Sequence, residues 1–204
     1  MEILELLKAG SLRLKSYNIN SCRVDSEILL AKIFDKRREE LLINLEQKVT
    51  PEIVASFNKL IARRSLKEPI AYILEEKEFW SKNFFVNKNT LIPRPETELM
   101  VEQIVQIFKD KSLSILDIGT GSGCILLSIL SELKKSRGVG VDISQKAIQI
   151  AIKNSIKHKL CHKAKFYKKS LAQIYNHKFD LIVSNPPYID RKNIKNLDDD
   201  IKKF

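Results

Sequence analysis

The sequence predicts an α/β fold, in which a parallel sheet with helices on both faces follows a small all-helical domain. Three observations support this prediction. Apolar residues recur at helical spacing through the first 75 residues, an aromatic-rich stretch comes next, and from Ser112 onward short apolar runs alternate with helical patterns. Strands that alternate with helices at this length form a parallel sheet, because each helix carries the chain back to the edge where the next strand starts.

The first domain, residues 1–75, is predicted to contain short amphipathic helices. Stripes of apolar side chains indicate helical segments over residues 2–14, 25–34, 39–45 and 69–74. Thr50-Pro51-Glu52 marks a further helix start, with Thr as the N-cap, Pro at the first helical position and an acidic residue in the first turn. That helix is expected to end near Arg64. Nothing in this domain looks catalytic.

A linker, residues 76–95, is predicted to form a β-hairpin. Glu78–Asn87 is rich in aromatic residues, and its turn is expected near Lys82 and Asn83. The segment Leu91–Glu98 reads Leu-Ile-Pro-Arg-Pro-Glu-Thr-Glu, and each proline disfavours helical backbone for the residue before it. A helix is therefore expected to begin only at Glu96 and to run to Phe108.

The remaining residues, 96–204, form the predicted α/β domain. Strands are expected over residues 113–118, 138–141, 164–167 and 179–183, and helices over residues 124–134, 145–158 and, as a short turn, 171–175. The sheet that results has about four parallel strands.

Composition and charge limit where the protein works. The hydrophobic fraction of 44% is that of a folded protein. No apolar run approaches the roughly 20 residues that span a bilayer. The acidic, amphipathic N-terminus does not resemble a signal peptide, and the three scattered cysteines fit a reducing compartment, so a cytoplasmic protein is expected. The net charge of +11 suggests either a phosphate-bearing partner or lysines that fill solvated faces. The even spread of the lysines favours the second interpretation.

A predicted strand runs directly into a glycine-rich loop. Residues 114–123 read Ser-Ile-Leu-Asp-Ile-Gly-Thr-Gly-Ser-Gly, and a helix is expected to start at the next residue. Glycines let a ligand lie against the backbone, and a helix N-terminus offers free N–H donors. Asp142 follows the next strand, 19 residues after Gly123, where a carboxylate can accept both hydroxyls of an adenosine ribose.

This combination matches class I methyltransferases, which bind S-adenosylmethionine in a Rossmann-like fold. Residues 117–123 show the spacing Asp-x-Gly-x-Gly-x-Gly rather than the Gly-x-Gly-x-x-Gly of dinucleotide binders. The predicted cofactor-binding residues from the two motifs are Asp117, Gly119, Thr120, Gly121, Ser122, Gly123 and Asp142.

The fourth strand is followed by Asn-Pro-Pro-Tyr at 185–188, the predicted catalytic and substrate-binding loop. Two prolines fix the direction of the chain, and ligands of parallel sheets bind where strands end. The side chain of Asn185 and the carbonyl of Pro186 can each accept a hydrogen from a planar NH2 group. Pro187 keeps the loop rigid, and Tyr188 can pack on the face of the acceptor. An amide nitrogen held in this way is oriented for in-line attack without a general base.

His158, Cys161 and His162 superficially resemble metal ligands, but no second ligand cluster accompanies them. A surface turn is the favoured interpretation, and no metal is expected.

Over nearly its whole length the chain resembles the HemK/PrmC family, the protein-(glutamine-N5) methyltransferases of peptide chain release factors. The resemblance rests on the helical domain, the hairpin, Leu91–Glu98, the two cofactor motifs and residues 185–188. It implies methylation of the glutamine in the Gly-Gly-Gln motif of class 1 release factors, which act in translation termination. It also implies that the helical domain helps to dock the release factor. Asn-Pro-Pro-Tyr alone is shared with adenine-N6 methyltransferases.

Two departures from the family pattern stand out. The family has Asp-Trp or Asn-Trp near the adenine, whereas this chain has Lys168-Lys169-Ser170-Leu171, so Ser170 is the nearest predicted cofactor contact. The family sheet has seven strands, and only four are expected here, so the domain is interpreted as incomplete. Either a separate chain supplies the rest or the chain is truncated, and we expect weak stability and poor activity. An adenine-N6 methyltransferase acting on RNA or DNA, or an inactive fragment that retains only binding, are the alternatives.

Overall fold

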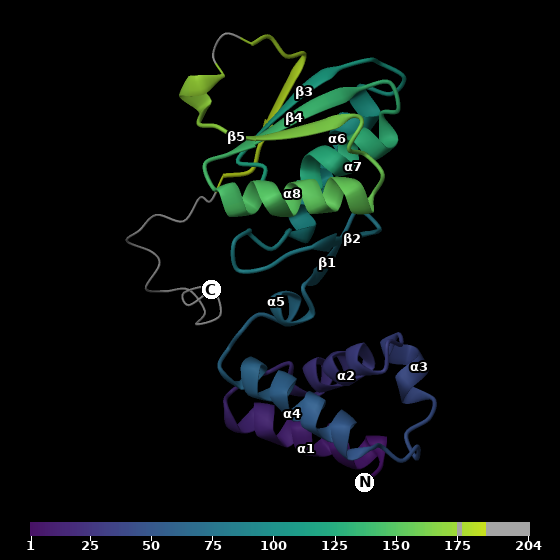
Figure 1. The fold of residues 1–204 in the computed structure, drawn as a ribbon. Helices are drawn as coiled ribbons and strands as arrows, with labels where there is room; N and C mark the ends of the chain where they lie inside the picture. The colour runs from purple at the N-terminus through teal and green to yellow at the C-terminus, as the bar shows by residue number, and fades with distance from the viewer. Residues whose placement is uncertain (175–176, 187–204) are drawn as a thin grey trace. The chain divides into compact units, whose positions relative to one another are not determined.

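The computed structural model describes residues 1–174 and 177–186 (Figure 1). The described residues divide into two compact units, residues 1–74 and residues 75–186 without 175 and 176. Pro187 and Tyr188 of the predicted acceptor loop lie outside the described residues, as do the last residues of the chain.

The first unit is helical, as predicted. Its helices are α1 (Ile3–Ser16), α2 (Cys22–Ile33), α3 (Arg38–Leu42), α4 (Pro51–Ser65) and α5 (Ile70–Leu74). Thr50 is the N-cap of α4 and Pro51 its first residue, as expected from the sequence. The apolar stripes merge into one core around side chains that are fully buried, among them Leu14, Leu30, Phe57 and Ile61.

A β-hairpin opens the second unit, but its turn is not where the sequence placed it. Strands β1 (Glu76–Phe79) and β2 (Lys82–Phe85) pair antiparallel, so the turn falls on Trp80 and Ser81 rather than on Lys82 and Asn83. Both turn residues have φ of +53°, which a two-residue turn of the favoured hairpin type requires. Contacts to the following helices hold this conformation, because the Trp80 N–H donates to Glu98 at 2.9 Å and its indole N–H to Glu132 at 3.1 Å.

The predicted parallel sheet is confirmed for the described residues. Strands β3 (Ser114–Ile118), β4 (Arg137–Asp142), β5 (Ala164–Lys168) and β6 (Leu181–Ser184) lie in the order β5-β4-β3-β6. All neighbouring pairs are parallel, and Asp117 of β3 stands opposite Gly140 on one side and Val183 on the other. The carboxyl ends of β3, β4 and β6 therefore meet at one edge of the sheet.

Within the described residues the α-helices of this unit cover one face of the sheet, whereas the sequence predicted helices on both faces. Helices α6 (Glu98–Ile107), α7 (Cys124–Glu132) and α8 (Gln145–Lys157) share a core with the face that carries Ile115 and Val183 (Figure 1). The opposite face carries Leu116 and Val141, and within the described residues only short segments that include Ile174 and Phe179 pack there. Two 3-10 turns, η1 (Pro95–Thr97) and η2 (Leu171–Gln173), complete the unit.

Candidate functional site

The predicted glycine loop connects β3 to α7, and its glycines have left-handed backbone conformations. Gly119, Gly121 and Gly123 have φ of +70°, +55° and +78°, values that favour glycine over every other residue. The loop is anchored on the neighbouring strand, because the N–H groups of Gly119 and Thr120 both donate to the Val141 carbonyl, at 2.9 and 3.0 Å. Its course is therefore fixed by strand β4 as well as by its own glycines.

The glycines of this loop serve different purposes. A Cβ atom added at Gly119 would meet nothing within 4 Å, and one added at Gly121 would meet only a backbone oxygen at 3.9 Å. These two positions leave open space beside the backbone. A Cβ at Gly123 would instead come within 3.2–3.3 Å of core side chains, namely Ala151, Leu127 and Phe166. Gly123 thus allows close packing beneath the loop, and only the first two glycines face a volume that a ligand can enter.

Asp117 lies at the floor of the loop with no solvent exposure. One carboxylate oxygen accepts a hydrogen bond from the Thr120 hydroxyl at 2.6 Å, whereas Oδ1 has no hydrogen-bond partner within the described residues. Burial raises the pKa of Asp117 to about 6, against the opposing effect of Thr120 and of the Leu126 N–H in the first turn of α7; the charge of Asp142 raises it further. A buried, half-satisfied carboxylate of this kind is suited to a cationic ligand.

Asp142 closes the loop from the neighbouring strand end. Its Oδ2 accepts the N–H of Gly121 at 3.1 Å, and its Oδ1 accepts the N–H of Ser144 at 2.8 Å, where Ser144 caps α8. A carboxylate has about four acceptor positions, so it can still accept hydroxyl groups. The structure therefore places Asp142 beside the glycine loop, as the sequence spacing predicted.

Ser170 and Ser122 take positions that limit their roles. Ser170 follows β5 next to Asp142, since the N–H of Lys169 donates to the Asp142 carbonyl at 3.1 Å, and Ser170 caps η2 through Gln173. The side chain of Ser122 is buried, with the residue 2% exposed.

Asn154, which sequence reasoning missed, ties the loop to the hairpin. This side chain of α8 is fully buried, and its amide nitrogen donates to the carbonyls of Ser122 and Phe85, both at 2.9 Å. Its oxygen accepts the Phe85 N–H at 2.7 Å. The amide thus joins the end of β2 to the glycine loop, and the sequence alone gives no signal of this role.

Two hydrogen bonds hold the end of β6, one to the end of β3 and one to η1. The Ser184 hydroxyl donates to the Ile118 carbonyl at 3.0 Å, and the amide nitrogen of Asn185 donates to the Thr97 hydroxyl at 3.0 Å. Pro186 follows and is exposed. Thr97 belongs to the segment that carried the family resemblance, but sequence reasoning gave it no role.

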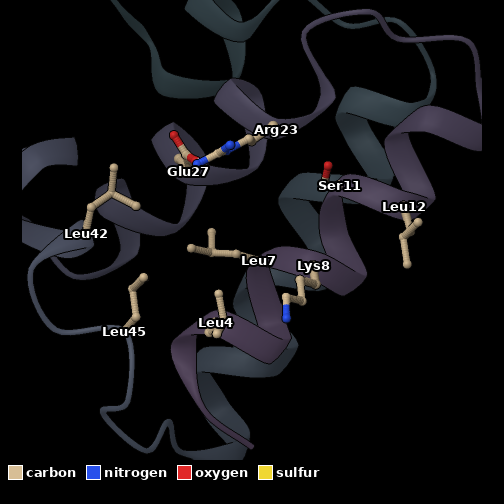
Figure 2. Close-up of a pocket in the computed structure, with 9 residues that line it drawn as sticks. All are labelled: Leu4, Leu7, Lys8, Ser11, Leu12, Arg23, Glu27, Leu42 and Leu45. Atoms are coloured by element: carbon tan, nitrogen blue, oxygen red, sulfur yellow. The ribbon is translucent and has the colours of Figure 1, made fainter.

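The helical unit has a separate hollow, between α1, α2 and the segment that includes α3. Figure 2 shows its lining, which is mostly leucine with an ion pair at one side: Leu4, Leu7, Lys8, Ser11, Leu12, Arg23, Glu27, Leu42 and Leu45. Glu27 accepts a hydrogen bond from Arg23 at 2.9 Å. The hollow contains no catalytic constellation.

No helix in the described ranges combines the length and apolar character that crossing a membrane requires. Within the same residues, no group of three or more His, Cys, Asp or Glu side chains is arranged to hold a metal ion.

Two family models match the chain. The PrmC N-terminal domain matches residues 5–74, and the methyltransferase small domain matches residues 95–201. Among solved structures, ribosomal protein L11 methylase from Lactobacillus delbrueckii subsp. bulgaricus overlaps 46% of this chain and 47% of its own, with 27% identity and a TM-score of 0.40.

Curated relatives agree with the family models. A release factor glutamine methyltransferase of Buchnera aphidicola subsp. Schizaphis graminum is 44% identical over 88% of this chain and 65% of its own length. One from Buchnera aphidicola subsp. Baizongia pistaciae is 39% identical over 98% and 72%. A bifunctional methyltransferase of Rickettsia conorii is 37% identical over 92% and 41%. The chain thus spans between about two fifths and three quarters of the length of these relatives.

The change Asn154→Asp should destabilise the second unit by roughly 2–3 kcal/mol. It removes the two hydrogen bonds that Asn154 donates, and it places a carboxylate oxygen against the carbonyl oxygens of Phe85 and Ser122. Urea unfolding followed by fluorescence of Trp80, the one tryptophan of the chain, measures this. Gln149→Glu makes the same chemical change at an exposed position of α8 and should be neutral. Equal stability of the two variants would show that the Asn154 bridge contributes nothing.

The pKa of Asp117 predicts a pH-dependent difference between the wild type and Asp117→Asn. Because the folded-state pKa, about 6, exceeds the ordinary 3.8, the folded state binds the proton more tightly. The free energy of unfolding of the wild type should therefore fall relative to that of the variant as pH rises from about 4 to about 6. From about pH 6 to pH 8 the difference between the two proteins should stay constant. Unfolding of both proteins across this range tests this, with the exposed Asp110→Asn as the control. A constant difference from pH 4 to pH 8 would contradict the assignment.

Proposed function

The chain belongs to the family of release factor glutamine methyltransferases, and from this premise we propose that it transfers the methyl group of S-adenosylmethionine to the glutamine of the Gly-Gly-Gln motif in class 1 peptide chain release factors. The acceptor atom is the side-chain amide nitrogen. The observation that carries this proposal is the placement of Asn185 at the strand end next to the loop of Asp117 and Gly119. One site can therefore bring a planar amide to a cationic cofactor.

The residues of the loop fit S-adenosylmethionine. The buried Oδ1 of Asp117 has no hydrogen-bond partner in the described chain, and the ammonium group of the cofactor would provide one. The backbone at Gly119 and Gly121 leaves room for the methionine end. The cofactor would be held by the residues predicted from the sequence: Asp117, Gly119, Thr120, Gly121, Ser122, Gly123, Asp142 and Ser170. When bound, it supplies an electrophilic methyl group on a sulfonium, which is a good leaving group.

The chain's own contribution to the reaction is to orient the acceptor. The Oδ1 atom of Asn185 would accept one hydrogen of the glutamine amide and the carbonyl of Pro186 the other, so that the nitrogen lone pair is free to attack in line. Pro187 would keep this loop rigid, and Tyr188 would pack on the planar amide. The new bond from nitrogen to the methyl carbon would form as the bond from that carbon to sulfur breaks, and the leaving group is a neutral thioether. The amide nitrogen would then lose one of its two protons to solvent, so no side chain has to act as a base.

The helical unit, proposed to span residues 1–75, would help to dock the release factor, with the hairpin linker at 76–95 ahead of the catalytic domain at 96–204. Its leucine-lined hollow is the apolar surface that such docking could use (Figure 2). Release factors act in translation termination, so the protein would work in the cytoplasm.

Incubation with S-adenosylmethionine labelled in its methyl group should transfer label to a release factor. The label should disappear when the motif glutamine of the release factor is replaced by alanine. Asn185→Ala should lower kcat about a hundredfold, because the acceptor amide loses its orientation. Label in total RNA, with none in the release factor, would favour an adenine-N6 methyltransferase, and no label in either would favour a chain that only binds.

Binding of S-adenosylhomocysteine should depend on the ionised form of Asp117. The ammonium group of this ligand stabilises the carboxylate, so affinity should fall as pH drops below about 6, by up to about tenfold per pH unit. Asp117→Asn should bind more weakly at pH 8 and lose the pH dependence. Calorimetric titration from pH 5 to pH 8 measures both effects, and a wild-type affinity that stays flat over this range would rule out the role of Asp117.

A further inference from the structure

Thr97 occupies a helix start, yet its hydroxyl is not used as a helix cap. The residue is the N-cap of α6 and the last residue of η1, and its side chain makes no capping hydrogen bond. Its backbone is helical, with φ of −71° and ψ of −18°, because η1 runs directly into α6, whereas an N-cap that accepts an N–H of the first turn has extended backbone. Here the hydroxyl is instead 3.0 Å from the amide nitrogen of Asn185, 88 positions further along the chain. The side chain is therefore directed at the acceptor loop.

The backbone around Thr97 is held from two directions. Its own N–H donates to the Arg94 carbonyl at 3.0 Å and closes the turn that Pro95 begins. The next residue, Glu98, accepts the N–H of Trp80 at the tip of the hairpin. A hydroxyl on such a constrained segment can act as a fixed point for a neighbouring side chain.

A side-chain amide has two ends with opposite hydrogen-bonding character, so its orientation matters. The NH2 group of a substrate amide has hydrogens to donate, and only Oδ1 of Asn185 can accept them. If the Asn185 amide turned over, its own NH2 group would face the NH2 group of the substrate. The hydrogen bond to Thr97 occupies the nitrogen of Asn185 and leaves the oxygen for the substrate.

We propose that Thr97 is a positioning residue for methyl transfer, whose hydroxyl accepts the Asn185 amide and so presents Asn185 Oδ1 to the substrate amide. This inference rests on the proposed function of Asn185 for its catalytic consequence. The hydrogen bond itself does not depend on that function, and the two can be tested separately.

The kinetic test compares three substitutions at Thr97 in the full chain. Thr97→Val keeps the shape and removes the acceptor, and should lower kcat about tenfold or more with the affinity for S-adenosylhomocysteine unchanged. Thr97→Ser should restore turnover. Thr97→Asp, which can only accept, should retain more activity than the valine variant, and it remains a good helix cap. Thr50→Val replaces another N-cap threonine without a capping bond and should leave turnover unaltered.

A second measurement reads the hydrogen bond without turnover. In the 15N-labelled chain, the side-chain NH2 signals of Asn185, identified by their loss in Asn185→Asp, should shift in Thr97→Val and stay in place in Thr97→Ser. Valine and wild-type proteins with the same NH2 signals, or equal kcat, would overturn the proposal, as would a loss of kcat explained wholly by weaker cofactor binding. If the signals shift but the wild type methylates no release factor, the hydrogen bond stands, and both the function proposed for the chain and the catalytic role of Thr97 fail.

Discussion

The central position of β3 in the sheet is the constraint on which the site depends. Its parallel pairing with β4 on one side and β6 on the other brings three carboxyl ends to one edge. The glycine loop, Asp142 and Asn185 leave the sheet at that edge, although Asn185 lies 68 residues after Asp117 in the sequence. Hydrogen bonds then fix the segments that strand pairing has brought together. The Ser184 hydroxyl donates to the Ile118 carbonyl, and the Gly121 N–H donates to the Asp142 carboxylate. The strand order of the sheet, rather than any single loop, therefore determines where these residues lie.

Two features of this edge have a functional explanation, and the first of them costs stability. Asp117 is kept without solvent and without a full set of hydrogen bonds, so its ionised form is disfavoured until a cation arrives. Thr97 makes no capping bond with α6, and its hydroxyl accepts the amide of Asn185. In each case a polar group is directed toward the place where a ligand would lie. Groups that lack their usual local partners are expected at functional sites.

Much of this architecture could be predicted from sequence, because β3, β4, β5 and β6 have short apolar runs and the loop after β3 has a strongly constrained backbone. The turn of the hairpin could not, since Trp80 and Ser81 adopt positive φ without glycine and are stabilised by contacts to Glu98 and Glu132. Asn154 and Thr97 were missed for a related reason. A polar residue whose partner lies far away in sequence looks like an ordinary surface residue until the chain is folded. The face on which the described α-helices pack could not be predicted either, because apolar periodicity indicates that α6, α7 and α8 pack on the sheet but does not indicate on which side.

One edge of the sheet thus forms a single ligand site to which Thr97 and Asn185 contribute together with the glycine loop. The sharpest test is a titration of S-adenosylhomocysteine into the 15N-labelled chain. Backbone amide signals of Gly119, Gly121, Thr97 and Asn185 should shift together with one dissociation constant, whereas those of residues 1–74 should stay unchanged. Shifts confined to the helical unit, or shifts of the glycine loop with those of Thr97 and Asn185 unmoved, would contradict it.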